Sequence, residues 1–261
     1  MVLRKEGAGR VVFADNTIIP FIIVAAGTAR FSDTSISEVT LDGGTVDGTG
    51  SIGRLMSLAG GGTVAPGTSV GRLTCTEVAW NVATKFVPEL LTPVTPGKTH
   101  DQLKVNGPVE LGGAALRVVT LAGFTNVTGN AYVIIDNDGT DAVSGTFAGL
   151  PQGAVVDIGT AAFTISYAGG TGNDVVLTQV PPLRVLSTTV VRGTGSNAGH
   201  YVIGLAGTGI PRATYQLETS PDLIRWTATQ TTTASHAGTW TFTDTSRLLT
   251  EPRYFLRVGL H

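Results

Sequence analysis

The sequence has few charged residues and only one cysteine. Asp, Glu, Lys and Arg make up 14% of its 261 residues, below the roughly 25% usual for globular domains, and the formal net charge is −2. No basic field is therefore present to attract nucleic acid or an acidic membrane. The single cysteine, Cys75, excludes an intrachain disulfide. Because it lies between Thr74 and Thr76 with no base nearby, we expect a buried strand residue rather than a reactive thiol.

Long apolar runs and catalytic motifs are also missing. The segment Met1 to Glu6 lacks the apolar core of a signal peptide, and no stretch reaches transmembrane length. No G-x-S-x-G, H-E-x-x-H or phosphate-binding loop occurs, and the histidines are far apart in the sequence. We therefore expect no enzyme. A pair of glycosidase carboxylates leaves no local signature, so a β-helix polysaccharide lyase or hydrolase stays an alternative.

Glycine and short apolar runs dominate what is present. The chain has 35 glycines, and between Ile134 and Val180 apolar runs alternate with turns rich in Gly, Asp and Asn. This alternation predicts successive β-strands joined by tight turns, and periodicity of the helical kind is nearly absent. The composition therefore predicts an all-β protein.

A repeat of 17 or 18 residues runs through the N-terminal part of the chain. Gly9, Gly27, Gly44 and Gly62 begin or end equivalent turns, each followed by a short apolar segment. One coil of a β-solenoid fits this period, with Gly at the corners and an apolar interior shared by stacked coils. An antiparallel sandwich with Gly-rich turns is the alternative.

Two segments resemble the autotransporter-associated β-strand repeat of bacterial surface proteins. Lys5, Gly7, Gly9, Val12 and Ile23 match its pattern K-x-G-x-G-x-L-x-L followed by T-x-V-x-x-G-x-L, whereas residues 20–22 depart from it. The segment 60–74, GGGTVAPGTSVGRLT, resembles the family's G-x-V-x-P-G-x-S-x-G-x-L. The resemblance implies a right-handed parallel β-helix from a passenger region, assigned here to residues 1–98.

Residues 99–180 resemble the unit that closes many such passenger helices. In relatives it begins Y-D-Q-L-x-V-x-G-x-V-x-L-G-G-A and ends G-G-x-G-N-D-V-V-L-T, and His100 stands where the family usually has Tyr. The implied role is a β-rich cap on the end of the solenoid, which terminal repeats must supply.

Two turns in this unit are weak calcium candidates. Asp136, Asp138 and Asp141 form one acidic turn, but Gly139 and Phe147 occupy the wrong positions for an EF-hand. The segment 169–177 matches the calcium nonapeptide G-G-x-G-x-D-x-U-x, with Asp174 as its acidic residue, yet it occurs once, and such sites form between repeats. We expect ordinary turns and no cofactor, with calcium as the alternative.

Residues 181–261 form a separate module behind the linker Pro181-Pro182. Strands are expected at 183–191, 200–206, 214–219, 225–230, 238–243 and 253–258, which predicts a small antiparallel β-sandwich. The expected core residues are Tyr215, Leu217, Trp226, Phe242, Phe255 and Val258. The segment resembles a fibronectin-like C-terminal module of exported proteins of environmental bacteria. The residues that match its patterns, Y-x-L-x-x-S-x-D-L-x-x-W, G-x-x-x-F-x-D and R-x-F-Y-R-V, are Tyr215, Leu217, Ser220, Asp222, Leu223, Trp226, Phe242, Asp244, Arg253 and Arg257.

Together these features predict a non-catalytic structural or adhesive part of a bacterial surface or secreted protein. We expect it to lie outside the cell or on the outer membrane, as part of a longer exported chain. The expected partner is a surface polysaccharide or another cell-surface protein, with no nucleic acid. Trp226 and Trp240 are candidate platforms for a sugar ring, so a carbohydrate-binding module of an exoenzyme is a further alternative.

Overall fold

The computed structural model describes residues 2–14, 20–32, 35–250 and 253–261. These residues form β-strands, turns and one short 3-10 helix, η1 (Gly195–Asn197), which confirms the all-β prediction. The chain divides into two compact units. The first comprises Met1–Ile158 and Phe163–Gln179, and the second Gly159–Ala162 and Val180–His261.

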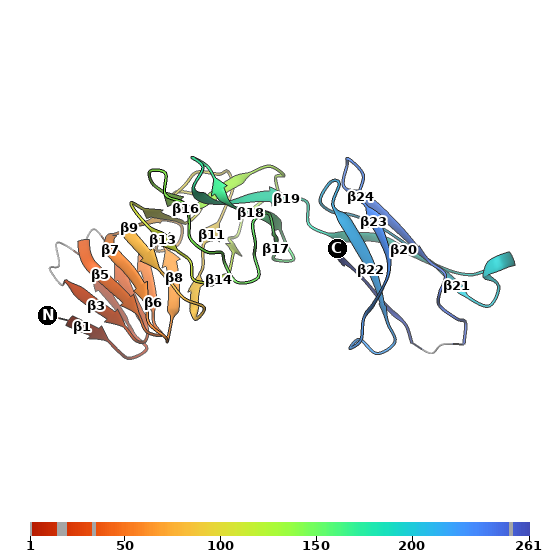
Figure 1. Cartoon of the computed structure of the whole chain (residues 1–261), viewed down its shortest axis with the longest axis horizontal. Coiled ribbons are helices and arrows are strands. Elements are labelled where there is room, and N and C mark those ends of the chain that lie inside the picture. Colours follow the sequence, from red (N-terminus) through yellow and green to blue (C-terminus); the bar gives the residue numbers. More distant parts are fainter. Residues whose placement is uncertain (1, 15–19, 33–34, 251–252) are drawn as a thin grey trace. The chain divides into compact units, whose positions relative to one another are not determined.

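The first unit is a parallel β-solenoid of about four turns (Figure 1). Its long sheet contains, in spatial order, β1 (Val2–Lys5), β3 (Phe21–Val24), β5 (Ser35–Leu41), β7 (Ser51–Ser57), β9 (Arg72–Ala79), β12 (Gln102–Val105), β16 (Ala131–Asn137), β19 (Asp174–Val180), β18 (Ala162–Gly169) and β17 (Val155–Asp157), with β13 (Val109–Glu110) also on β9. A second sheet contains β14 (Ala115–Leu116), β10 (Thr84–Phe86), β8 (Gly62–Pro66), β6 (Thr45–Gly48), β4 (Thr28–Phe31) and β2 (Arg10–Phe13), while β11 (Glu89–Leu90) pairs with β15 (Val119–Thr120).

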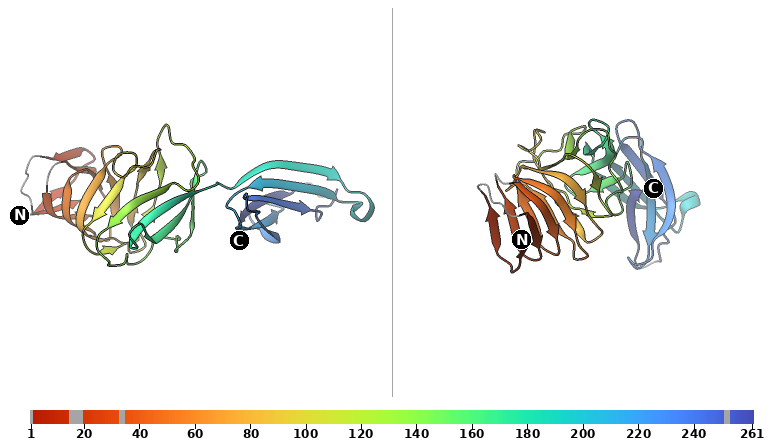
Figure 2. Two further views of the ribbon diagram at one scale, coloured as in Figure 1. Left: turned by 90° about the horizontal axis from the view of Figure 1, so that it is seen from above. Right: turned by 60° about the vertical axis from the view of Figure 1, so that its left-hand side comes forward.

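Each coil gives one strand to each of the two larger sheets, so residues one coil apart stack on each other. Ile22 pairs with Val39, Val39 with Leu55 and Leu55 with Val78, all in parallel register, and all four side chains are buried. Both views in Figure 2 show these strands side by side. The apolar ladder fills the interior, as stacked repeats require.

The predicted glycine repeat forms one corner of the solenoid. The carbonyl of Gly9 accepts a hydrogen bond from the amide of Thr28 in the next coil (3.2 Å), and Gly44 accepts one from Thr63 (2.9 Å). Gly27 has a φ of 66°, and a Cβ there would overlap the carbonyl of Gly9. The corner therefore needs glycine for close backbone approach as well as for its backbone conformation.

Beyond β9 the parallel stack continues into an antiparallel end. β12 pairs with β9 in parallel register, so the long sheet passes residue 98 without a break. β16 then pairs with β19 in antiparallel register, and β18 and β17 complete the sheet. Phe86 packs between Trp80 and Phe147, at 5.5 and 6.1 Å between ring centroids, so buried aromatic rings cover the interior here.

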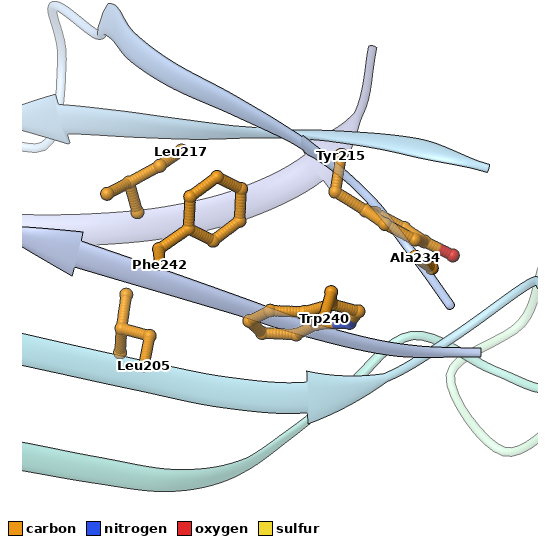
Figure 3. Packing of buried hydrophobic residues seen from close by; sticks show 6 residues of the cluster. All are labelled: Leu205, Tyr215, Leu217, Ala234, Trp240 and Phe242. Atoms are coloured by element: carbon orange, nitrogen blue, oxygen red, sulfur yellow. The ribbon is translucent and has the colours of Figure 1, made fainter. Parts of the chain in front are cut away.

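The second unit is a small antiparallel β-sandwich. One sheet has the order β20 (Arg184–Arg192), β21 (Tyr201–Thr208), β24 (Thr239–Asp244), and the other β23 (Thr227–Thr233), β22 (Thr214–Ser220), β25 (Phe255–Leu260). Figure 3 shows side chains from both sheets meeting in one core that contains Leu205, Tyr215, Leu217, Ala234, Trp240 and Phe242. The parallel solenoid followed by an antiparallel sandwich is the predicted fold class.

Truncation of an interior phenylalanine should destabilise the solenoid far more than truncation of an outer one. Phe31 is fully buried and stacks on Phe13 at 5.2 Å, whereas Phe21 is 44% exposed. Phe31→Ala should lower the free energy of unfolding by roughly 3–5 kcal/mol, because it leaves a cavity in the ladder. Phe21→Ala should cost less than about 1 kcal/mol. Urea unfolding followed by circular dichroism measures both, and equal costs would contradict the placement of these side chains.

Candidate functional site

The two acidic turns named as calcium candidates lie side by side where β16 ends and β19 begins. The amide of Asn137 donates to Oδ1 of Asp174 (2.9 Å). The side-chain amide of Asn173 donates to the carbonyls of Asp138 (2.9 Å) and Asp141 (3.1 Å). The structure thus joins the two turns, which are more than thirty residues apart in the chain, through one network of hydrogen bonds, called the turn knot below.

Asp174 is the centre of the turn knot. Its side chain is buried, and Oδ2 accepts hydrogen bonds from the amide of Thr171 (2.9 Å) and from its hydroxyl (3.2 Å). A Cβ at Gly170 would overlap Oδ2, so glycine is required for the turn to wrap the carboxylate. Both carboxylate oxygens therefore face N–H or O–H donors.

The other acidic candidates contribute little of their carboxylate chemistry to the turn knot. Asp138 and Asp141 are exposed and take part through their backbone carbonyls, while Asp136 lies half-buried on β16. Within the described residues, no group of three or more His, Cys, Asp and Glu side chains is arranged to hold a metal. This geometry fastens β16 to β19 and does not gather carboxylates into the oxygen shell that calcium takes.

The two tryptophans named as sugar platforms have different surroundings. Trp240 is 2% exposed and packs against Tyr215 (6.1 Å) and Phe242 (5.8 Å) in the core of the sandwich (Figure 3). Trp226 is half-buried, and the guanidinium of Arg257 lies over its ring at 4.3 Å. The prediction that Trp226 lies in the core is therefore wrong, because Trp240 lies there instead. Arg257 covers part of the Trp226 ring that is not buried.

A buried polar cluster that the sequence did not indicate lies at the start of β12. His100 and Gln102 are both buried and both point a side-chain nitrogen at the carbonyl of Val133 (3.3 and 3.1 Å). The ring of His100 meets Tyr132 edge-on at 5.3 Å. Burial lowers the pKa of His100 to about 4, and the charge of Arg72 adds to that effect. The imidazole is therefore neutral at physiological pH.

Three carboxyl groups, Asp47, Glu89 and Asp101, line a cavity in the solenoid, and two of them, Asp47 and Asp101, are engaged in structural contacts. Asp101 is 1% exposed, and its two oxygens accept the amides of Gly71 (2.8 Å) and Glu89 (2.9 Å). Burial raises the pKa of Asp101 to about 8, although these two hydrogen bonds oppose the shift. Asp47, which lines the same cavity of about 120 Å³, forms a bidentate ion pair with Arg30. The arrangement ties neighbouring coils together and leaves neither carboxylate oriented by a catalytic partner.

Cys75 is fully buried on β9, as predicted, and burial raises the pKa of its thiol to about 12. Such a thiol is unreactive near neutral pH because it carries almost no thiolate.

Comparison of the chain with protein-family models, curated proteins and solved structures found no match. Within the described residues, no helix has the length and apolar character needed to cross a membrane. The functional argument therefore depends on the fold and on the contacts described above.

Loss of the Asp174 carboxylate should loosen the closing end whether or not calcium is present. Asp174→Ala removes the acceptor for three donors on Asn137 and Thr171, and it should cost roughly 2–4 kcal/mol of unfolding free energy because buried donors lose their partner. Asp138→Ala, which keeps its backbone carbonyl, is the matched control and should change little. Thermal unfolding in calcium and in chelator measures the effect. A wild-type melting temperature that rises with calcium, and no longer does so in Asp174→Ala, would instead show a calcium site.

Acid should destabilise the first unit through His100. The imidazole of His100 binds a proton near pH 6.5 in the unfolded chain but only near pH 4 in the folded chain. The stability that neutral His100 contributes is therefore present above pH 6.5 and is lost as the pH falls from 6.5 through 4. His100→Gln should reduce the acid-induced loss by roughly 3 kcal/mol, because Gln does not titrate. Urea unfolding measured at several pH values tests this.

The pKa of Asp101 shifts in the opposite direction, so only the difference between wild type and variant isolates His100. Asp101 contributes stability at low pH that is lost as the pH rises toward about 8. His236→Gln, at an exposed position, serves as the control. Parallel pH profiles for wild type and His100→Gln would contradict the role given to His100.

Proposed function

We propose that this chain is a non-catalytic structural or adhesive part of a bacterial surface or secreted protein, similar in build to an autotransporter passenger. The observation that supports this most is the in-register stack of parallel coils closed by an antiparallel end. Each coil contacts only its neighbours, so such a fold produces length and side surface rather than a deep pocket. Length and surface are what a protein needs to present a binding module away from its anchor.

The second unit supports an interaction role for the C-terminal module. Residues 181–261 contain seven arginines and four acidic residues, whereas the whole chain has two more acidic than basic residues. It folds as two three-stranded antiparallel sheets and carries large exposed apolar side chains. We extend the proposal to the fibronectin-like module that the sequence patterns resemble. A positively charged, partly apolar module suits contact with another surface molecule outside the cell.

A carbohydrate-binding module of an exoenzyme is the second candidate, and the half-buried Trp226 is the observation that favours it. The face of a partly exposed aromatic ring is a common contact for sugars, but Arg257 already covers part of this ring. A β-helix enzyme is the third candidate. Two of the three carboxyl groups that line the solenoid cavity, Asp101 and Asp47, are engaged by backbone amides and by Arg30, which leaves Glu89 without a second free carboxylate there.

The purified chain should bind surfaces without cleaving them. Incubation with pectin, alginate, xylan and chitin should release no reducing ends or unsaturated products above a blank, because Asp101 and Asp47 beside the solenoid cavity are held by backbone amides and by Arg30 and are not free to act as a catalytic pair. Beads coated with the chain should adhere to bacterial cells or to immobilised surface polysaccharide more than beads coated with albumin. Clear turnover of any polysaccharide would overturn the non-catalytic proposal. Adhesion that Trp226→Ala abolishes while Arg225→Ala leaves it intact would favour the carbohydrate-binding candidate.

A further inference from the structure

Strand β20 is an unusually exposed edge strand. It is the end strand of its sheet and pairs only with β21 among the described residues. All nine of its residues, from Arg184 to Arg192, are exposed. Because an antiparallel strand directs alternate N–H and C=O groups to each side, the outer side of β20 presents a row of backbone donors and acceptors to another strand.

The side chains of β20 are apolar where protected edge strands are usually charged. Val185, Leu186, Val190 and Val191 are 51%, 67%, 57% and 56% exposed. The interior of the strand contains no Lys, Glu or Pro, and its only irregularity is a bulge between Val185 and Ser187. A long apolar edge of this kind promotes pairing with another chain unless something covers it.

A groove of about 390 Å³ adjoins the inner face of the same strand. Val190 pairs with Ile203, and these two side chains line the groove with Tyr201, Tyr254 and Phe255. Arg247 fixes one wall, because its guanidinium lies over the ring of Tyr254 at 5.0 Å and donates to the carbonyl of Arg253 (2.7 Å). Side chains from an added strand would enter this groove beside the β20 edge.

The charge around β20 indicates the chemistry of the partner. Arg184 and Arg192 are exposed at the two ends of the strand, and Arg253 is exposed beside the groove. An added strand with apolar side chains at its centre and carboxylates at its ends matches this pattern. A second copy of β20 matches it poorly, because antiparallel pairing that places Val185 opposite Val191 also places Arg184 opposite Arg192, and like charges directly opposite are destabilising.

We propose that the free edge of β20 accepts an extended polypeptide segment of another protein, apolar at its centre and acidic at its ends, as a fourth strand of this sheet. Addition of a strand gives affinity through backbone hydrogen bonds and specificity through alternate side chains. This proposal rests on the adhesive role proposed above and names the partner chemistry for it. The bead assay tests the adhesive role by itself, and its result does not depend on β20.

Binding of designed strand peptides to the full-length chain tests the proposal. The probe is a fluorescein-labelled peptide in which Val and Thr alternate between terminal Glu residues. One control peptide has Pro in place of two central Thr residues, and another has Lys at both ends. Fluorescence anisotropy at low salt should show saturable binding of the Glu-ended peptide only, since Pro cannot donate to the sheet and Lys repels the arginines.

Charge reversal on β20 provides the matched variants. Arg184→Glu with Arg192→Glu should weaken the Glu-ended peptide by about fivefold and permit binding of the Lys-ended peptide, as expected for two exposed charge pairs. Arg225→Glu, at an exposed position in the loop between β22 and β23, should change the affinity for neither peptide. Circular dichroism checks that each variant is folded. Equal affinities for the Glu-ended and Pro-containing peptides, or an unchanged preference in the charge-reversed variant, would overturn the proposal. A concentration-dependent dimer of the wild-type chain in sedimentation that excess Glu-ended peptide dissociates would assign β20 to a second copy instead.

Discussion

The hydrogen bonding of one coil's backbone to the next is the interaction on which the first unit depends. Parallel strands pair only when neighbouring backbones come within about 4.8 Å, and this must hold at the corners as well as along the strands. Gly27 meets that condition at a corner where a Cβ would overlap the carbonyl of Gly9, and Gly48 does the same against Phe31. Once the corners allow the approach, the register follows, and residues such as Val39 and Leu55 stack into a continuous apolar interior. No single coil could bury these side chains alone, so backbone pairing and hydrophobic burial are one cooperative event.

The closing end meets a different requirement. Beyond the parallel coils the long sheet changes to antiparallel pairing, first of β16 with β19, and ends at β17. Because the turns at this end are rich in polar groups, their donors and acceptors need partners inside the fold. Asp174 supplies acceptors for the turn amides, and Asp101 does the same one coil earlier for Gly71 and Glu89. The carboxyl groups of Asp174 and Asp101 therefore hold turns in place in this unit.

The second unit is stabilised by aromatic packing between two small sheets rather than by stacked repeats. Trp240, Tyr215 and Phe242 form its centre, and their burial compensates for the small size of the sandwich. The core does not extend to β20, where every residue stays exposed. A strand that contributes so little to the core leaves apolar side chains and backbone groups in water unless another molecule covers it. This is the physical reason to regard β20 as an interaction surface. The two units thus combine a long repetitive body with a compact module that carries the adhesive chemistry proposed here.

Local pattern was sufficient to predict much of the fold. The glycine spacing and the alternation of apolar residues predicted the solenoid, and the strands expected after residue 181 lie within three residues of those observed. These features depend on backbone geometry and on a period of two along each strand, and both are determined by residues close together in the sequence. The sequence did not reveal that Asp174 and Asn137 meet, that Asp101 joins Gly71 to Glu89, or that Trp240 rather than Trp226 lies in the core. Those contacts join residues distant in the chain, and which polar or aromatic side chain becomes buried is decided only when the coils stack and the sheets close. Composition and periodicity therefore determined the all-β class and the repeat, whereas tertiary packing alone decided which acidic residues fasten turns and which strand is left without a neighbour.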